Sequence, residues 1–300
     1  MYPHASALSP EALGTRQMAF VSKLRSAWQR HWQHYVAEAA GIAFFLSSAS
    51  LLTVLLEHPA SPGYQALSQH PTFRTALMAV AMALVIVLIV YSPWGKRSGA
   101  HINPAVTVAF WHLGKIRTAD AAWYIVAQVA GAIGAGQLMK LVLGSFYAHP
   151  AVHYVTTQPK PGGSGQAFLG EFIISFILMM SMLVALHSRQ LKKWTGWLVG
   201  LLLALFILFE TPFSGMSLNP ARTLGAAVAA NSYTGLWIYW AAPVLAMWLA
   251  TSTFQMVYGR TSLACAVLAG CEAAANTPLY ADAGPATAEP PHYPDASGKG

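Results

Sequence analysis

The sequence predicts an all-α membrane protein with six transmembrane helices and two shorter re-entrant helices, arranged as an inverted repeat. Three observations lead to this prediction. The 300 residues are 55% hydrophobic and 9% charged, whereas soluble domains are about 25% charged. Long apolar runs recur along the chain, and one membrane crossing needs roughly 20 apolar residues. The triplet Asn-Pro-Ala occurs at 103–105 and again at 219–221, each time after such a run.

Six apolar segments are long enough to cross a bilayer. The third contains Gly131, Gly134 and Gly136, small residues that allow two helices to approach closely. The expected spans are residues 35–57, 73–94, 119–143, 166–187, 194–213 and 234–257.

Each Asn-Pro-Ala triplet predicts the start of a helix. Asparagine is a favoured N-cap, because its side-chain oxygen accepts from free N–H groups of the first turn. Proline suits the first helical position, where no N–H is needed. The helix from Pro104 to Gly114 reaches about 15 Å, half of a hydrocarbon core that is roughly 30 Å thick. The second, over about 219–230, is equally short. Both must therefore enter the membrane and leave on the same side.

The chain divides into two repeats, about 35–144 and 166–257, each with three spans and one half-helix. Because three is odd, the second repeat must be inserted upside down. Inverted repeats of this kind place broken helices together at the membrane midplane. Basic residues gather in the connections that this topology puts in the cytoplasm, which predicts that both termini are cytoplasmic.

The segments outside the repeats are expected to be cytoplasmic tails. Residues 1–34 are polar and basic and are predicted to end in a short interfacial helix. Residues 258–300 are rich in Ala, Pro and Gly and are predicted to lack fixed structure. The formal net charge of +7 is explained by basic loops that set topology rather than by a nucleic-acid partner. The two cysteines, Cys265 and Cys271, imply no disulfide framework.

The two motifs, Ser98-Gly99-Ala100-His101-Ile102-Asn103-Pro104-Ala105 and Asn219-Pro220-Ala221-Arg222, resemble the signatures of the major intrinsic protein family, the aquaporins and aquaglyceroporins. The resemblance covers about residues 35–257. It implies a passive channel for water and small uncharged solutes such as glycerol, assembled as a homotetramer with one pore per subunit. Opposed half-helix N-termini, each with about half a positive charge, would exclude cations and protons. Asn103 and Asn219 would each leave a side-chain NH2 free to donate to the permeant.

In this family four positions form the outer constriction. Counting from the two asparagines places them at Ala83, Ile207, Met216 and Arg222. Alanine and isoleucine at the first two positions predict a wider, more apolar opening than a strict water filter. Thr223 and the Tyr239-Trp240 pair instead resemble the water-channel subgroup, so the preference between water and glycerol stays open.

Three titratable residues in apolar surroundings have two interpretations. Glu38 and Glu171 lie within spans, where an acid is a candidate proton relay. The favoured interpretation is that each accepts hydrogen bonds from the re-entrant loop of its own half, because irregular backbone in a membrane must be satisfied by protein. His101 is a candidate pH switch, but loop bracing is favoured for it on the same ground.

Two other functions fit the pattern. A secondary transporter also uses inverted repeats and broken helices, but it needs ligands for a coupling ion, and the spans offer little beyond Glu38 and Glu171. A non-conducting junctional member of the family would show no flux. An enzyme is not expected, because the sequence has no nucleophile–base pair or phosphate-binding loop, and neither metal nor cofactor is predicted. The expected partners are the lipids of a plasma (inner) membrane, water and small neutral solutes.

Overall fold

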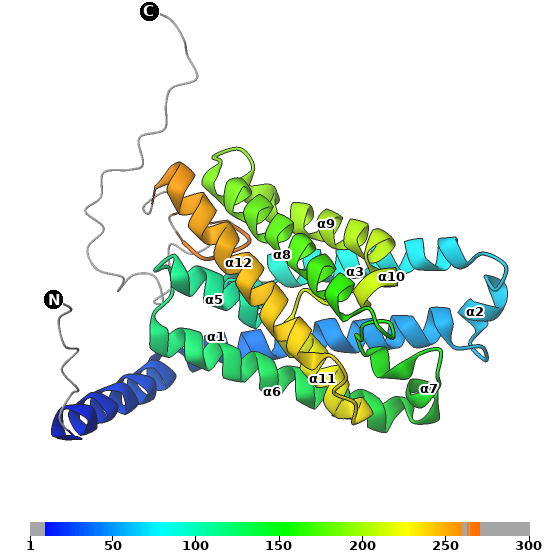
Figure 1. Ribbon diagram of the computed structural model, residues 1–300, viewed down its shortest axis with the longest axis horizontal. Helices are drawn as coiled ribbons and strands as arrows, with labels where there is room; N and C mark the ends of the chain where they lie inside the picture. The colour runs from blue at the N-terminus through cyan, green and yellow to red at the C-terminus, as the bar shows by residue number, and fades with distance from the viewer. Residues whose placement is uncertain (1–9, 260–262, 264, 271–300) are drawn as a thin grey trace, which may run out of the picture.

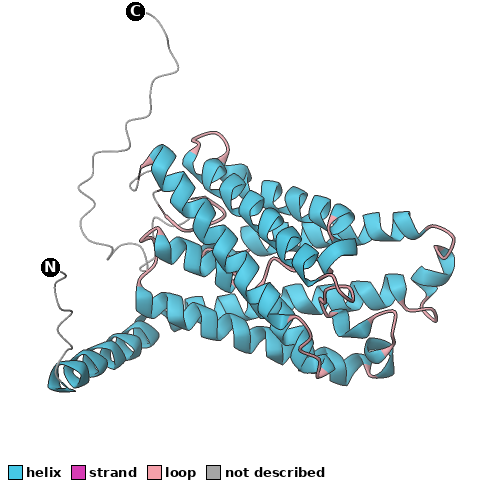
Figure 2. Cartoon of the chain, in the orientation of Figure 1, coloured by secondary structure: helices cyan, strands magenta, loops and turns pink. Residues whose placement is uncertain are grey.

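The computed structural model describes residues 10–259, 263 and 265–270, with side chains from residue 18 onward. Within these residues every regular element is a helix (Figures 1 and 2). The helices are α1 (Pro10–Glu57), α2 (Pro62–Ala66), α3 (Pro71–Tyr91), α4 (Pro93–Ser98), α5 (Pro104–His112), α6 (Thr118–Leu143), α7 (Ser145–Ala148), η1 (His153–Val155), α8 (Ser164–His187), η2 (Lys192–Trp194), α9 (Thr195–Phe209), α10 (Thr211–Ser214), α11 (Pro220–Ala230) and α12 (Leu236–Tyr258).

Helix α1 continues through most of the predicted N-terminal tail. It has 48 residues, so the boundary expected at residue 34 falls inside a helix. At 1.5 Å per residue its length is about 72 Å, more than twice the hydrocarbon core of a bilayer. The N-terminal part therefore projects beyond the other helices (Figure 1). Trp28 and Trp32 are exposed on that part, where interfacial tryptophans are expected.

Five described helices are long and apolar enough to cross a membrane. They are Met18–Glu57, Pro71–Tyr91, Thr118–Leu143, Ser164–His187 and Lys192–Phe209. Helix α12 occupies the predicted sixth span and has 23 residues. It carries several tryptophans and tyrosines and the polar run Thr251-Ser252-Thr253.

The packing of the helices repeats in the two halves. Helix α1 packs against α6 in the first half, and α8 packs against α12 in the second. Helices α3 and α9, one from each half, pack against each other. Both half-helices, α5 and α11, contact α6 as well as α12. The two short helices therefore lie between the last long helices of the two halves and tie the halves into one bundle (Figure 1).

Glycines allow the closest of these contacts. A Cβ added at Gly131 in α6 would lie 2.3 Å from the carbonyl oxygen of Ala39 in α1. At Gly136 it would lie 2.4 Å from the carbonyl oxygen of Gly225 in α11. Gly134, on the same helix, faces open space. Two of the three glycines expected to bring helices together therefore do so. One of them, Gly136, allows α6 to pack closely against the half-helix α11.

The chain folds back after α12. Residues 265–270, here called the C-terminal turn, are packed against the bundle, and Leu263, Val267 and Leu268 are buried. The prediction that residues 258–300 lack fixed structure is wrong for this turn, because its apolar side chains are buried against the bundle. Cys265 is disulfide-bonded, although the cysteine count implied no disulfide framework. The other cysteine of the sequence, Cys271, lies outside the described residues.

Candidate functional site

Asparagine caps begin both half-helices as predicted from the two triplets. Asn103 has extended backbone, and its side-chain oxygen accepts from the N–H of Ala105, 2.9 Å away. Asn219 does the same for α11, accepting from Ala221 at 3.0 Å and Arg222 at 3.3 Å. Proline occupies the first turn of each helix. Because both caps sit where the half-helices start, the two positive helix ends face the same region of the bundle.

The amide groups of the two asparagines join the two loops. Asn103 Nδ2 donates to the carbonyl oxygen of Leu218, and Asn219 Nδ2 donates to that of Ile102, each at 2.8 Å. A side-chain NH2 has two hydrogens, so each asparagine keeps one for another acceptor. The sequence-based expectation of a fully free NH2 is therefore corrected, because one hydrogen of each amide holds the opposite loop.

The loops before the half-helices share an unusual backbone. Residues 99, 100 and 102 in the first loop, and residues 215, 216 and 218 in the second, all have positive φ. Ala100, Ile102, Met216 and Leu218 are not glycine, and a left-handed conformation costs such a residue about 1–2 kcal/mol. Loops of this kind persist only where surrounding contacts hold them.

The carboxyl groups of Glu38 and Glu171 supply those contacts. Glu38 accepts from the backbone N–H groups of His101 (3.0 Å) and Ile102 (2.5 Å). Glu171 accepts from the equivalent groups of Ser217 (2.7 Å) and Leu218 (2.8 Å). Both side chains are 0% exposed. Their oxygens are occupied by loop N–H groups, which is the geometry that loop bracing requires.

Two tyrosines complete this arrangement, and the sequence interpretation missed their role. Tyr124 donates to the carbonyl oxygen of Ser98 at 2.6 Å, and Tyr239 donates to that of Ser214 at 2.5 Å. The pairs Ser98/Ser214 and Asn103/Asn219 are both separated by 116 residues, and the tyrosines by 115. A search at this spacing would have identified them.

An additional acid, Glu210, lies beside Glu171. The hydroxyl oxygen of Ser214 is 2.7 Å from Glu171 Oε1 and 2.8 Å from Glu210 Oε2, and it accepts from the N–H of Met216. One hydroxyl hydrogen can serve only one of the two carboxyls. Because Glu171 also accepts from two backbone N–H groups, we expect Ser214 to donate to Glu171 and a protonated Glu210 to donate to Ser214.

Two cavities adjoin one another beside the half-helices. The larger, of about 440 Å³, is lined by Met216 and Arg222 among others. The smaller, of about 60 Å³, is lined by both asparagines, His101 and Val106 among others. Phe45, Leu203 and Ser217 line both cavities, so the two adjoin. Together they trace a path past the starts of both half-helices.

Three of the four residues predicted for the constriction line the large cavity: Ile207, Met216 and Arg222. Ala83 is not among the lining residues. Its carbonyl oxygen lies 3.0 Å from where a Cβ on Gly200 of α9 would be, and so faces that helix. Met82 lines the cavity instead, because the rotation of α3 turns residue 82 rather than 83 toward the path.

The large cavity has two arginines with different surroundings. Arg74 forms two hydrogen bonds with the carboxylate of Glu57, at 3.2 and 3.3 Å, so its charge is neutralised by a partner. Arg222 donates from Nη1 to the carbonyl oxygen of Val155 at 2.9 Å. A carbonyl is neutral, so Arg222 keeps its positive charge beside the path.

His101 contacts the loop and the C-terminal turn. Its Nδ1 lies 3.2 Å from Thr107 Oγ1, and its Nε2 lies 2.9 Å from the carbonyl oxygen of Ala266. Because a carbonyl only accepts, the hydrogen sits on Nε2. The ring also stacks on Phe110. These contacts fix the ring at one end of the small cavity.

A family model places this arrangement among known proteins: the model described as Major intrinsic protein matches residues 25–254. The chain belongs to the major intrinsic protein family. The match covers both Asn-Pro-Ala triplets and all the helices between them. The resemblance inferred from the two motifs is thereby confirmed.

Named relatives of this chain are plant aquaporins. The chain is 41% identical to Aquaporin NIP1-2 of Oryza sativa subsp. japonica over 163 residues, 54% of each chain. It is 39% identical to Aquaporin NIP6-1 of Arabidopsis thaliana over 185 residues, 61% of this chain and 59% of that one. The chain thus spans between half and two thirds of the length of these relatives.

A solved structure shares the fold. The aquaglyceroporin from Plasmodium falciparum superposes with a TM-score of 0.63 and 17% sequence identity, covering 75% of this chain and 96% of that chain. At this identity the likeness concerns the fold. The predicted all-α architecture is accordingly confirmed.

Proposed function

We propose that this member of the family is a passive channel for water and small uncharged solutes of the size of glycerol, and that it excludes cations and protons. The observation that carries the proposal is the meeting of two asparagine-capped half-helices beside a path of two cavities. Positive helix ends repel cations. The remaining amide hydrogens of Asn103 and Asn219 donate to a passing oxygen, which orients it and interrupts a chain of hydrogen-bonded waters.

The filter of this channel is formed by Met82, Ile207, Met216 and Arg222. Three apolar side chains face one charged donor, so a molecule with a carbon face and a hydroxyl face can satisfy both walls. Methionine is flexible and adapts to ligands of different shape. Met82 in place of the expected Ala83 gives a narrower opening than the sequence suggested, but the apolar character remains.

The occupied carboxylates favour a channel over a secondary transporter. A coupled transporter needs polar groups near the midplane that can bind an ion. Glu38 and Glu171 already accept two backbone N–H groups each. If these carboxylates bound an ion instead, the four loop residues with left-handed backbone would lose the hydrogen bonds that hold them.

The orientation and assembly follow from charge and family. Basic residues lie at the end of the bundle where the C-terminal turn packs, including Arg97 and Lys192, and the positive-inside bias makes this end cytoplasmic. The channel is a homotetramer in a plasma (inner) membrane, with one pore per subunit. The molar mass of the purified protein, corrected for detergent, tests this assembly: about four times 32.1 kDa is expected, and a monomeric mass contradicts it.

The function is tested by stopped-flow light scattering on proteoliposomes. Leu268 also lines the small cavity, and a serine there is shorter. Water efflux in sucrose and re-swelling in glycerol are recorded for the wild type, for Leu268→Ser, and for Leu268→Ser combined with Arg222→Ala. Water flux above that of empty liposomes, with glycerol re-swelling, is expected for Leu268→Ser. Removing the arginine should raise glycerol flux relative to water, because the charged donor no longer narrows the filter. Rates equal to empty liposomes for all three folded proteins contradict the proposal.

A further inference from the structure

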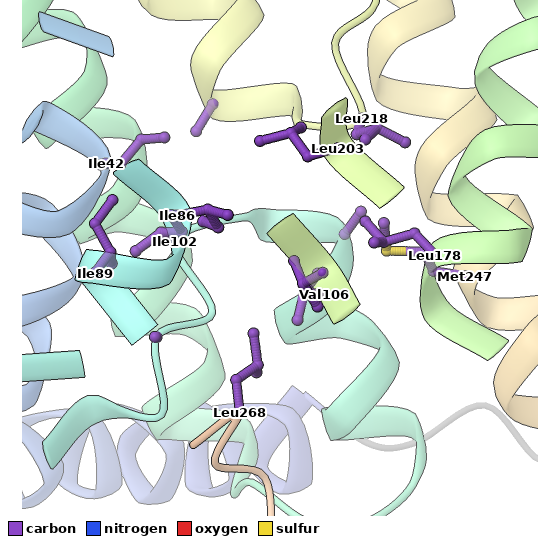
Figure 3. Packing of buried hydrophobic residues seen from close by; sticks show 14 of the residues in the cluster. Ile42, Ile86, Ile89, Ile102, Val106, Leu178, Leu203, Leu218, Met247 and Leu268 are labelled. Atoms are coloured by element: carbon purple, nitrogen blue, oxygen red, sulfur yellow. The ribbon is translucent and has the colours of Figure 1, made fainter. Parts of the chain in front are cut away.

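The C-terminal turn lies across the small cavity. Leu268 is 3% exposed, and its side chain lines this cavity together with Asn103 and Asn219. Figure 3 shows Leu268 rising from the turn toward Val106 of α5. The N–H of Leu268 donates to the carbonyl oxygen of Gly99 at 3.1 Å. The side chain therefore occupies the mouth of the path rather than its rim.

The turn is fixed to both halves of the molecule. His101 Nε2 donates to the carbonyl oxygen of Ala266 in the first half. In the second half, a Cβ added at Gly270 would lie 3.3 Å from the carbonyl oxygen of Lys192. Gly270 has φ +100°, a conformation that side chains rarely adopt, and its N–H donates to Val267 at 3.0 Å. The turn thus bridges the mouth, with a tight bend that aims Leu268 inward.

The sizes of the two cavities show the consequence. The large cavity has about 440 Å³ and the small one about 60 Å³. A cavity needs about 10–15 Å³ of such volume to hold one water molecule, so the small cavity has room for only a few. The other lining residues near its end are apolar, among them Ile86 and Leu178. The path is therefore wide where Arg222 lines it and narrow where the asparagines and Leu268 of the turn line it.

We propose that the C-terminal turn is a plug that closes the inner mouth of the channel through Leu268, and that the disulfide of Cys265 holds the plug in its closed shape. The inference rests on the proposed channel function. Cys265 is disulfide-bonded and lies three residues before Leu268. A cross-link restricts the conformations of the released segment and thereby favours the packed one.

Thiol chemistry releases the plug. A dithiol reductant gives two electrons and two protons, the S–S bond breaks into two thiols, and the reductant becomes a disulfide. Disulfides in reducing compartments are usually redox-active rather than structural. At the cytoplasmic end the channel is accordingly closed under oxidising conditions and open under reducing ones. Reduction of the disulfide removes this restriction and shifts the equilibrium toward the released turn.

The test is water permeability of proteoliposomes that contain the air-oxidised full chain. Leu268→Ser is expected to raise permeability, because losing one buried leucine shifts the seated-to-released equilibrium by roughly tenfold to a hundredfold. The water permeability should also rise for Cys265→Ser and for the wild type treated with dithiothreitol. The conservative Leu268→Met and the surface change Leu245→Ala, where the leucine is 54% exposed, should stay at the wild-type rate.

Each failure has a distinct meaning. Oxidised wild type and Leu268→Ser with equal rates, both above empty liposomes, would overturn the plug while leaving the channel in place. A higher rate for Leu268→Ser with no effect of dithiothreitol or Cys265→Ser would overturn the role of the disulfide. Rates at the level of empty liposomes for every folded variant would overturn the channel function itself.

Hydrogen exchange tests the plug without any flux. The N–H of Leu268 donates to Gly99, so its exchange in the oxidised full chain should be slow, and it should become fast on reduction. Exchange of this amide at the rate of an unstructured peptide in the oxidised protein would overturn the plug whatever the permeability is.

Discussion

The contact between α6 and the half-helix α11 gives a sharp prediction for Gly136→Ala. The added methyl group would lie 2.4 Å from the carbonyl oxygen of Gly225, whereas ordinary contact begins at 3.4 Å, so α11 must move by about 1.0 Å. Overpacking of this kind costs about 1–3 kcal/mol. The displaced helix carries Asn219 at its cap, so the strain falls on the centre of the path.

Gly134→Ala is the matched control, because Gly134 lies on the same helix and faces open space. Both changes gain the same helix propensity, about 1 kcal/mol, so their difference isolates the contact with α11. Gly136→Ala should melt about 2–12 °C below Gly134→Ala in the same detergent. This range is the overpacking cost of about 1–3 kcal/mol converted at roughly 2–4 °C for each kcal/mol. Equal melting temperatures would refute the close packing of α6 on α11.

Three further changes probe the loops, each by its melting temperature in detergent. Glu38→Gln should destabilise by about 1–3 kcal/mol, because both oxygens accept backbone N–H groups and an amide NH2 cannot accept; an unchanged melting temperature would show that the carboxylate does not brace the loop. Glu210→Gln should be close to neutral, because the amide can donate to Ser214 as the protonated acid does, whereas a large loss would mean that Glu210 is ionised. Tyr124→Phe should cost about 1–3 kcal/mol, since it leaves a buried loop carbonyl without its donor; wild-type stability would show that this hydrogen bond is dispensable.

The half-helices were predictable from the sequence because their chemistry is local. An asparagine cap followed by proline marks a helix start wherever it occurs, and the length of each apolar run decides whether the helix can cross. The positions of Glu38 and Glu171 beside the loops followed from the need to satisfy irregular backbone. These inferences depend on neighbours in the chain or on one physical requirement of the membrane.

The parts that sequence reasoning missed depend on packing between distant segments. Ala83 and Met82 differ by one residue, which is about 100° around a helix, and only the contact of α3 with α9 decides which faces the path. Ala266 of the C-terminal turn lies 165 residues from its hydrogen-bond partner His101, in a segment whose composition suggests no structure. The role of Glu210 followed only from counting the hydrogens available at Ser214.

The central claim is that the two half-helices form a path that passes neutral molecules and excludes cations. It is tested most directly by recording water efflux and proton flux together, the latter with a trapped pH-sensitive dye, in proteoliposomes of the Leu268→Ser variant. Water flux well above that of empty liposomes, with proton flux equal to theirs, is the predicted result. Proton flux that rises in proportion to water flux would contradict the claim, because the asparagine amides and positive helix ends would not then interrupt a conducting chain of water.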